Sequence, residues 1–221
     1  MNGWTEYAAA WAAFLLAHAV PVRPPLRPWL VASLGRVGFG IVYSALSLAV
    51  LGWMFAAAGR APFVLLWPSP AWGPWVVLIA MTAACLLVAA ELGRPNPLSI
   101  GGGDGAAFDP GRPGLLRLTR HPVLAALALW AGAHLVPNGD LAHVLLFGGF
   151  TAFALLGMRL IDRRRRAAAP DLWAAQVATI ASAPLRFSSM LRLIAGAGIV
   201  LLLLMLHPWM AGVDVLPLFH P

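Results

Sequence analysis

The stretch that decides the fold runs from residue 115 to residue 166 and reads LLRLTRHPVLAALALWAGAHLVPNGDLAHVLLFGGFTAFALLGMRLIDRRRR. Its two apolar runs, 123–136 and 141–161, are joined by the segment Pro-Asn-Gly-Asp. Pro122 suits the first position of a helix, where its missing amide hydrogen would be unpaired anyway. Asn-Gly is a strong turn signal, and Asp140 can cap the helix that follows. The pattern predicts a membrane hairpin with His134 buried in its first arm, and we expect the rest of the chain to pack around it.

Composition predicts an all-α, polytopic membrane helix bundle. The chain has 221 residues, of which 61% are hydrophobic and 10% are charged, and its mean hydropathy is +0.81. Soluble domains carry about a quarter charged residues. A single transmembrane domain over 1–221 is expected, because no polar stretch is long enough for a separate soluble domain. A nucleic-acid partner is not expected, since the arginines that give the net charge of +7 flank apolar runs. The expected partner is the lipid bilayer.

Six apolar runs are candidate membrane spans, with the boundaries 4–20, 37–58, 75–92, 122–136, 141–161 and 191–210. The fourth is shorter than the ~20 residues that cross ~30 Å of hydrocarbon. With both termini in the periplasm, fourteen of the fifteen arginines fall on the cytoplasmic side, as the positive-inside rule requires. The loops 93–121 and 162–190 are then cytoplasmic, and residues 167–183 are expected to form an amphipathic surface helix. Glu6 and the lack of basic residues before the first run argue against a cleavable signal peptide.

The histidines are the candidate site residues. His18 and His134 lie inside predicted spans, where an ionisable residue is costly and usually faces a partner, a cavity or a cofactor. A neutral histidine bonded to a neighbouring helix is an equally plausible interpretation of each. His121 stands at a helix start beside Arg120, as an interfacial or capping residue. The small residues 131–133 either allow close helix packing or leave a slot for a flat ligand beside His134.

The same stretch resembles the NnrU family of bacterial membrane proteins, to which the plant zeta-carotene isomerase is related. The similarity is carried by four motifs: Gly-Leu-Leu-Arg-Leu-Thr-Arg-His-Pro at 114–122, Leu-Trp-Ala-Gly-Ala-His-Leu at 129–135, Asn-Gly-Asp at 138–140 and Asp-Arg-Arg at 162–164. His18 in the first span also fits. The resemblance implies a protein of the bacterial inner membrane that is associated with nitrite and nitric oxide respiration, with respiratory nitrogen-oxide proteins as possible partners.

Through the plant relative, the resemblance further implies a b-type haem whose iron is bound by two histidines, which correspond to His18 and His134. Helix geometry sets these two residues at depths that differ by roughly 9 Å, so His121 is the reserve ligand in place of His134. The plant enzymes have a cysteine, implicated as an alternative iron ligand, where this chain has Ala131. That difference argues against ligand exchange by this route, and leaves an isomerase-like activity undecided.

The Arg-His-Pro element is also similar to that of the isoprenylcysteine methyltransferases. Their cofactor site needs acidic and aromatic residues downstream, whereas this chain has Arg-Arg-Arg-Arg-Ala-Ala-Ala-Pro at 163–170. Three function classes are therefore carried forward. The first is a haem-binding membrane protein, the second is a non-enzymatic assembly or regulatory factor for nitrogen-oxide reductases, and the third and least favoured is a membrane methyltransferase.

Overall fold

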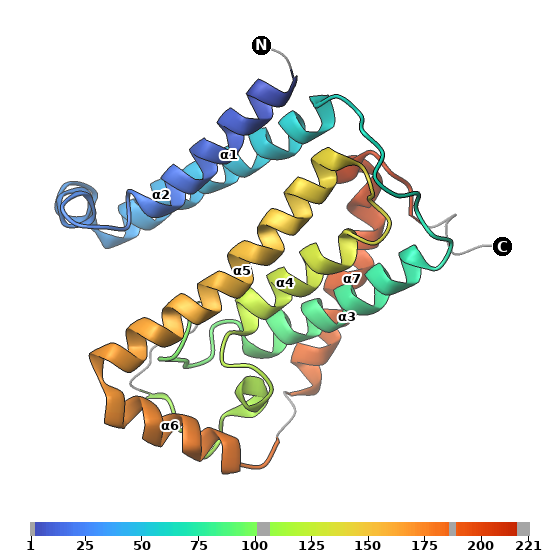
Figure 1. Ribbon diagram of the computed structural model, residues 1–221. Helices are drawn as coiled ribbons and strands as arrows, with labels where there is room; N and C mark the ends of the chain where they lie inside the picture. The colour runs from blue at the N-terminus through green and yellow to red at the C-terminus, as the bar shows by residue number, and fades with distance from the viewer. Residues whose placement is uncertain (1–2, 101–106, 186–188, 216–221) are drawn as a thin grey trace. The chain divides into compact units, whose positions relative to one another are not determined.

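The computed structural model describes residues 3–100, 107–185 and 189–215, and the regular elements in these ranges are helices. In chain order they are α1 (Gly3–Ala19), α2 (Leu26–Arg60), α3 (Gly73–Glu91), the 3-10 helix η2 (Gly114–Arg117), α4 (Pro122–His134), α5 (Leu141–Ala168), α6 (Pro170–Ser182) and α7 (Met190–Ala211) (Figure 1). Within the described ranges, pairing of the strand type is limited to one isolated bridge between Leu65 and Asp140. The expected all-α class is confirmed.

The helices α2, α3, α5 and α7 are each long and apolar enough to cross a membrane. The helices α1 and α4 have 17 and 13 residues, which is short of the ~20 that a full crossing takes. The protein is therefore a membrane protein by the length and composition of its helices. The number of crossings and the side on which each terminus lies stay predictions.

The hairpin turn forms as its residues predict. Pro122 occupies the first turn of α4, and the backbone amide of His143 donates to the Asp140 carboxylate at 3.2 Å, which caps α5. The arginine block 163–166 was expected to end the second apolar helix, but α5 continues through it to Ala168. Arginine is a good helix former, so a helix that has left the apolar layer can run on until the residue before Pro170. The expected surface helix then follows as α6.

The chain forms two compact units, each described by itself. Unit 1 comprises residues 1–66 and 140–146, and unit 2 comprises residues 67–139 and 147–221. In unit 1, α1 packs on α2 through buried side chains that include Tyr7, Phe14 and Met54. The Tyr7 hydroxyl donates to the Ala142 carbonyl at 2.9 Å, which fastens the first residues of α5 to α1.

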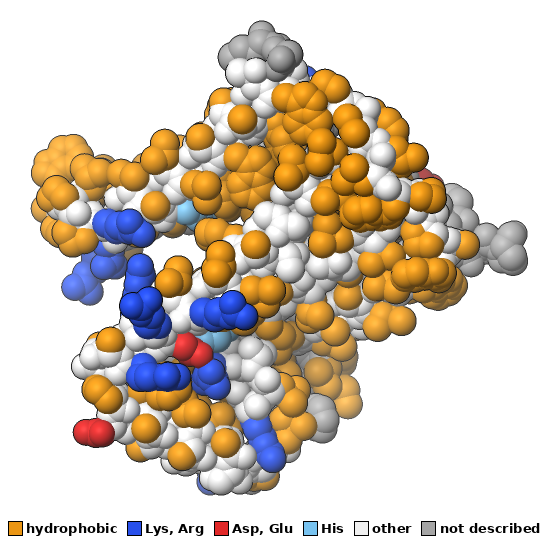
Figure 2. Space-filling model, viewed as in Figure 1, with side chains coloured by type: hydrophobic (Ala, Val, Ile, Leu, Met, Phe, Trp, Pro, Cys, Tyr) orange, Lys and Arg blue, Asp and Glu red, His pale blue; other side chains and the backbone are white. Residues whose placement is uncertain are grey.

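In unit 2, α3 packs on both α4 and α7. The hairpin contact between α4 and α5 is aromatic, because the Trp130 ring lies 5.5 Å from the rings of Phe147 and Phe150. Helix α6 lies across the end of α5, and the described residues 93–100 and 107–121 of the polar segment lie at the same end of the unit (Figure 1). Arginine side chains gather over this end, whereas the helix surfaces next to it are hydrophobic (Figure 2).

Candidate functional site

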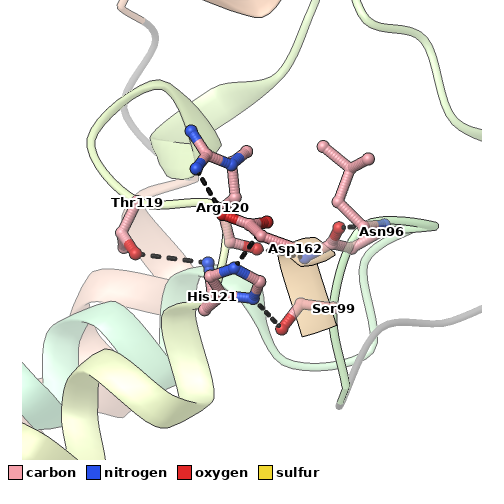
Figure 3. Close-up of polar contacts among 7 residues, drawn as sticks. Asn96, Ser99, Thr119, Arg120, His121 and Asp162 are labelled. Atoms are coloured by element: carbon pink, nitrogen blue, oxygen red, sulfur yellow. Dashed lines mark hydrogen bonds and ion pairs between the residues drawn. The ribbon is translucent and has the colours of Figure 1, made fainter. Parts of the chain in front are cut away.

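His121 is the centre of a buried polar cluster at the start of α4. It is 3% exposed, and its Nε2 lies 3.0 Å from Asp162 Oδ1 while its Nδ1 lies 2.8 Å from Ser99 Oγ (Figure 3). A carboxylate only accepts hydrogen bonds, so Nε2 carries the proton and Nδ1 accepts from the Ser99 hydroxyl. The backbone amide of His121 donates to Thr119 Oγ1 at 3.2 Å. The imidazole is thus held on both of its nitrogens.

Arg120 reaches the same carboxylate from the other side. Its Nη2 donates to Asp162 Oδ2 at 2.6 Å, and its backbone carbonyl accepts from the Asn96 side-chain amide at 3.0 Å. The Arg120 guanidinium also lies 5.8 Å from the Trp173 ring of α6, over which Arg166 stacks at 4.4 Å. Asp162 therefore joins the segment before α4 to α5, and Arg120 extends this network to α6.

The electrostatics of the cluster keep its histidine neutral. Burial lowers the pKa of His121, and this effect outweighs the Asp162 carboxylate, which favours the charged ring, while nearby Arg120 lowers the pKa further. The order hydroxyl, imidazole, carboxylate is the one that activates a nucleophilic serine in acyl transfer. Here, however, Ser99 is only 9% exposed and His121 less. The geometry suits a structural contact that holds Ser99 and His121 on α5 better than it suits a site open to substrate.

Glu91 makes a second buried contact that holds the polar segment, here on the end of α3. It is 3% exposed at the end of α3, and its Oε1 accepts the backbone amide of Leu115 at 2.9 Å. Arg94, three residues further along the chain, lies 3.7 Å from the other carboxylate oxygen of Glu91. The polar segment between α3 and α4 is thus fixed by buried side chains near both of its ends.

His134 lies at the other end of α4 in apolar surroundings. Its Nδ1 lies 2.7 Å from the Trp130 carbonyl one turn earlier, and its ring lies 5.1 Å from the Phe147 ring. Because a carbonyl only accepts, Nδ1 carries the proton and Nε2 is the unprotonated nitrogen of the neutral ring. Ala131 and Ala133 are buried in unit 2, so close packing accounts for the small residues at these positions.

His18 has the same backbone hydrogen bond in unit 1. Its Nδ1 lies 2.9 Å from the Phe14 carbonyl, also one turn earlier, and its ring lies 4.1 Å from the Phe14 ring and 6.2 Å from the Tyr43 ring. The bond again leaves the proton on Nδ1 and makes Nε2 the basic nitrogen. His18 and His134 thus share one tautomer, which differs from that of His121.

The three candidate ligands are divided between the two compact units. His18 belongs to unit 1, whereas His121 and His134 belong to unit 2. The thirteen residues of α4 separate His121 from His134 by roughly 20 Å along the helix axis, which excludes iron binding by that pair. No cluster of three or more histidine, cysteine or acidic residues suited to a metal ion occurs among the described residues. The ligand assignments of all three histidines stay predictions, and His121 would have to break an existing bond to bind iron.

Comparison with protein families shows the family to which the chain belongs. The model of one family, described as NnrU protein, matches residues 6–215. The chain belongs to the NnrU family. No curated protein and no solved structure matches it.

The NnrU motifs at 114–122 and 162–164 contain the residues of the buried cluster, since Arg120 and His121 come from the first and Asp162 from the second. Sequence reasoning treated these residues separately and missed their contact. It also missed Ser99 and Asn96. The available signal was Asp162 itself, an isolated acid between an apolar run and four arginines, which needs a cationic partner nearby.

Proposed function

We propose that this NnrU-family protein binds a b-type haem in the membrane through His18 and His134 and acts in nitrite and nitric oxide metabolism. The observation that carries the proposal is the matching hydrogen bond from Nδ1 of each histidine to its own helix, at 2.9 Å to Phe14 and 2.7 Å to Trp130. A histidine that ligates a metal usually donates its other ring N–H to a carbonyl or carboxylate, which fixes the ring and raises its basicity.

The surrounding side chains suit such a group. The aromatic rings beside the two histidines, which are Phe14 and Tyr43 for His18 and Trp130 and Phe147 for His134, offer flat apolar surfaces that exclude water. When bound, haem supplies a redox-active iron whose reactivity is set by its axial ligands and by the polarity around it. The chain's own contribution is to hold two imidazole rings on apolar helices by the same backbone hydrogen bond.

The test of haem binding is the visible spectrum of the full-length protein, purified in detergent from cells supplied with a haem precursor. We expect a low-spin b-type spectrum that is lost in His18→Gly and in His134→Gly and partly restored by added imidazole, which replaces a missing ligand but repairs no folding defect. His143→Gly and His207→Gly are the matched controls and should retain the spectrum. A protein without a Soret band under ample haem, or with a band that survives both ligand substitutions, would contradict the proposal.

The physiological part of the proposal rests on family membership. Deletion of the gene from a denitrifying host should slow growth on nitrite more than aerobic growth. If the wild-type gene and the double variant His18→Ala/His134→Ala complement the deletion equally, the protein acts without haem. That result would favour an assembly factor for nitrogen-oxide reductases. Equal growth of deletion and parent on nitrite would remove the physiological assignment.

We further propose a multi-pass orientation in the inner membrane with both termini in the periplasm, because it puts nearly all arginines on the cytoplasmic side. Ser69 and Ser182 are exposed positions on opposite predicted sides. In a Cys85→Ser background, an impermeant maleimide applied to spheroplasts should label Ser69→Cys and spare Ser182→Cys. The reverse pattern would invert the orientation.

A further inference from the structure

Helix α2 is broken near its start, and the break creates a surface that the haem proposal does not use. Gly35 has φ +72° and ψ 168°, values outside the helical region, so residues 26–34 turn away from the rest of the helix. Figure 1 shows the short segment as a coil turned out of line with the long arm of α2. A residue with a side chain would be strained at this φ, which explains why glycine is present.

A cavity of about 500 Å³ opens at the break. Two cationic side chains, Arg27 before the break and Arg36 after it, line this cavity together with apolar side chains that include Val22, Val31 and Phe39. No carboxylate contributes to the lining. We call this surface the α2 cavity.

The arginines of the α2 cavity are available to a ligand. None of the ion pairs between described residues involves Arg27 or Arg36. In contrast, Arg60 at the far end of the same helix pairs with Glu6, which also accepts a hydrogen bond from Trp53. The positive charge at the break is therefore not neutralised by a neighbouring acid of the described chain.

The side chains around the cavity are those of a lipid-facing surface. Trp29 is 64% exposed and Val37 is 76% exposed, and Leu34 between them is 44% exposed. Exposed apolar residues beside cations are typical of a helix that lies at the headgroup level, with tryptophan as the interfacial anchor. Figure 2 shows arginine side chains beside the hydrophobic side chains at this end of α2.

We propose that the α2 cavity binds the phosphate of an anionic phospholipid, with Arg27 and Arg36 as the two cationic contacts. Two guanidinium groups on either side of a helix break match the several acceptor oxygens of a phosphodiester. The apolar lining and the exposed residues nearby favour a lipid over a free anion, because acyl chains cover surface that a soluble phosphate would leave in water. The site is independent of haem binding.

The test is native mass spectrometry of the full-length protein in detergent, titrated with dioleoyl phosphatidylglycerol or dioleoyl phosphatidylcholine. We expect one phosphatidylglycerol to be retained in preference to phosphatidylcholine. Arginines near a membrane surface strengthen the binding of anionic lipid, so Arg27→Gln/Arg36→Gln, which removes two of them, should weaken retention about 30-fold. Arg163→Gln/Arg164→Gln is the control, because it removes the same charge from exposed arginines of α5 and should change retention of this lipid little.

Three results would overturn the proposal. The first is equal retention of the two lipids by the wild type, and the second is an equal loss of phosphatidylglycerol in the two double variants, which would mean that only net charge matters. The third is displacement of phosphatidylglycerol by millimolar inorganic phosphate, which would indicate a site for a soluble anion. A thermal scan of each variant confirms that it is folded, and Arg27→Lys/Arg36→Lys, which keeps both charges, should retain most of the binding.

Discussion

His121 and His134 lie at opposite ends of α4, and the two ends are fixed by different contacts. At the His121 end the contacts are between side chains. Ser99 and Asp162 bond to the two ring nitrogens of His121, and His121 and Arg120 bond to the two carboxylate oxygens of Asp162. At the His134 end the acceptors are backbone carbonyls: the Asn138 side-chain amide donates to the His134 carbonyl at 2.8 Å, and the Trp67 backbone amide donates to the Gly139 carbonyl at 3.2 Å.

This difference distinguishes His121, whose contacts are structural, from His134, which we propose as a ligand. The His121 ring is committed on both nitrogens, so its removal breaks a network but exposes no ligand atom. The His134 ring is oriented by one bond to its own helix, which leaves Nε2 as its basic atom. A spectrum that responds to His121 and not to His134 would reverse this interpretation.

The largest effect is expected at the His121 end, from Asp162→Ala. It leaves His121 and the Arg120 guanidinium without their common acceptor, and because the pair is half-buried, its loss costs at most about 3 kcal/mol. For a chain of this size that corresponds to roughly 6–12 °C in the unfolding midpoint. A thiol-reactive dye can report unfolding, because Cys85 is buried and is the only cysteine. Asp171→Asn on α6 is the control, and an equal loss there would contradict the role of Asp162.

At the opposite end, Gly139→Ala tests the backbone contact. A Cβ atom at this position would lie 2.0 Å from the Trp67 carbonyl oxygen, so the turn or the preceding segment must move. Overpacking of this kind costs about 2 kcal/mol. Gly148→Ala in α5 meets nothing within 4 Å and should be neutral or slightly stabilising in the same dye assay. A tolerated Gly139→Ala would mean that this end is held less tightly than the contact suggests.

Much of this arrangement follows from local sequence signals. Pro122 as a helix start, Asp140 as a cap and the pairing of Glu91 with Arg94 all depend on residues within a few positions of one another, and all three are present. Apolar length likewise predicted the four helices that are able to cross a membrane, but it also predicted spans at 4–20 and 122–136, where the helices are too short for a full crossing.

The contacts that were missed join residues far apart in the chain. Asp162 meets His121 across 41 positions, and Trp67 meets Gly139 across an even longer separation in the chain. A single sequence does not show which distant residues pair, because any of the arginines or histidines could have been the partner of Asp162. The helical segment 26–34 and the break at Gly35 were missed for another reason: the predicted span began only at residue 37, and the prolines and arginines before it are typical of a loop.

A smaller effect is expected from Ser99→Ala. The substitution removes the hydroxyl that donates to His121 Nδ1 but leaves the ion pair of Asp162 with Arg120 intact. One lost hydrogen bond to a buried acceptor costs about 1 kcal/mol. The midpoint in the dye assay should therefore fall by much less than in Asp162→Ala. The haem spectrum should not change. Loss of the spectrum in this variant would show that the His121 cluster also supports the proposed haem site.

The smallest effect is expected in the pH dependence of stability. Burial lowers the pKa of His121, so the unfolded chain, whose histidines titrate near ~6.5, binds this proton more readily than the folded chain. The stability that the neutral ring contributes is thus complete above that pH and is lost as the pH falls toward the lowered value. In His121→Gln the amide can still donate to Asp162 and accept from Ser99, but it does not titrate. Thermal scans by tryptophan fluorescence between pH 8 and pH 5 should show a steeper acid loss for the wild type than for His121→Gln. Parallel curves would mean that protonation of this ring is not coupled to unfolding, and that the acid sensitivity of the protein arises from groups outside the cluster.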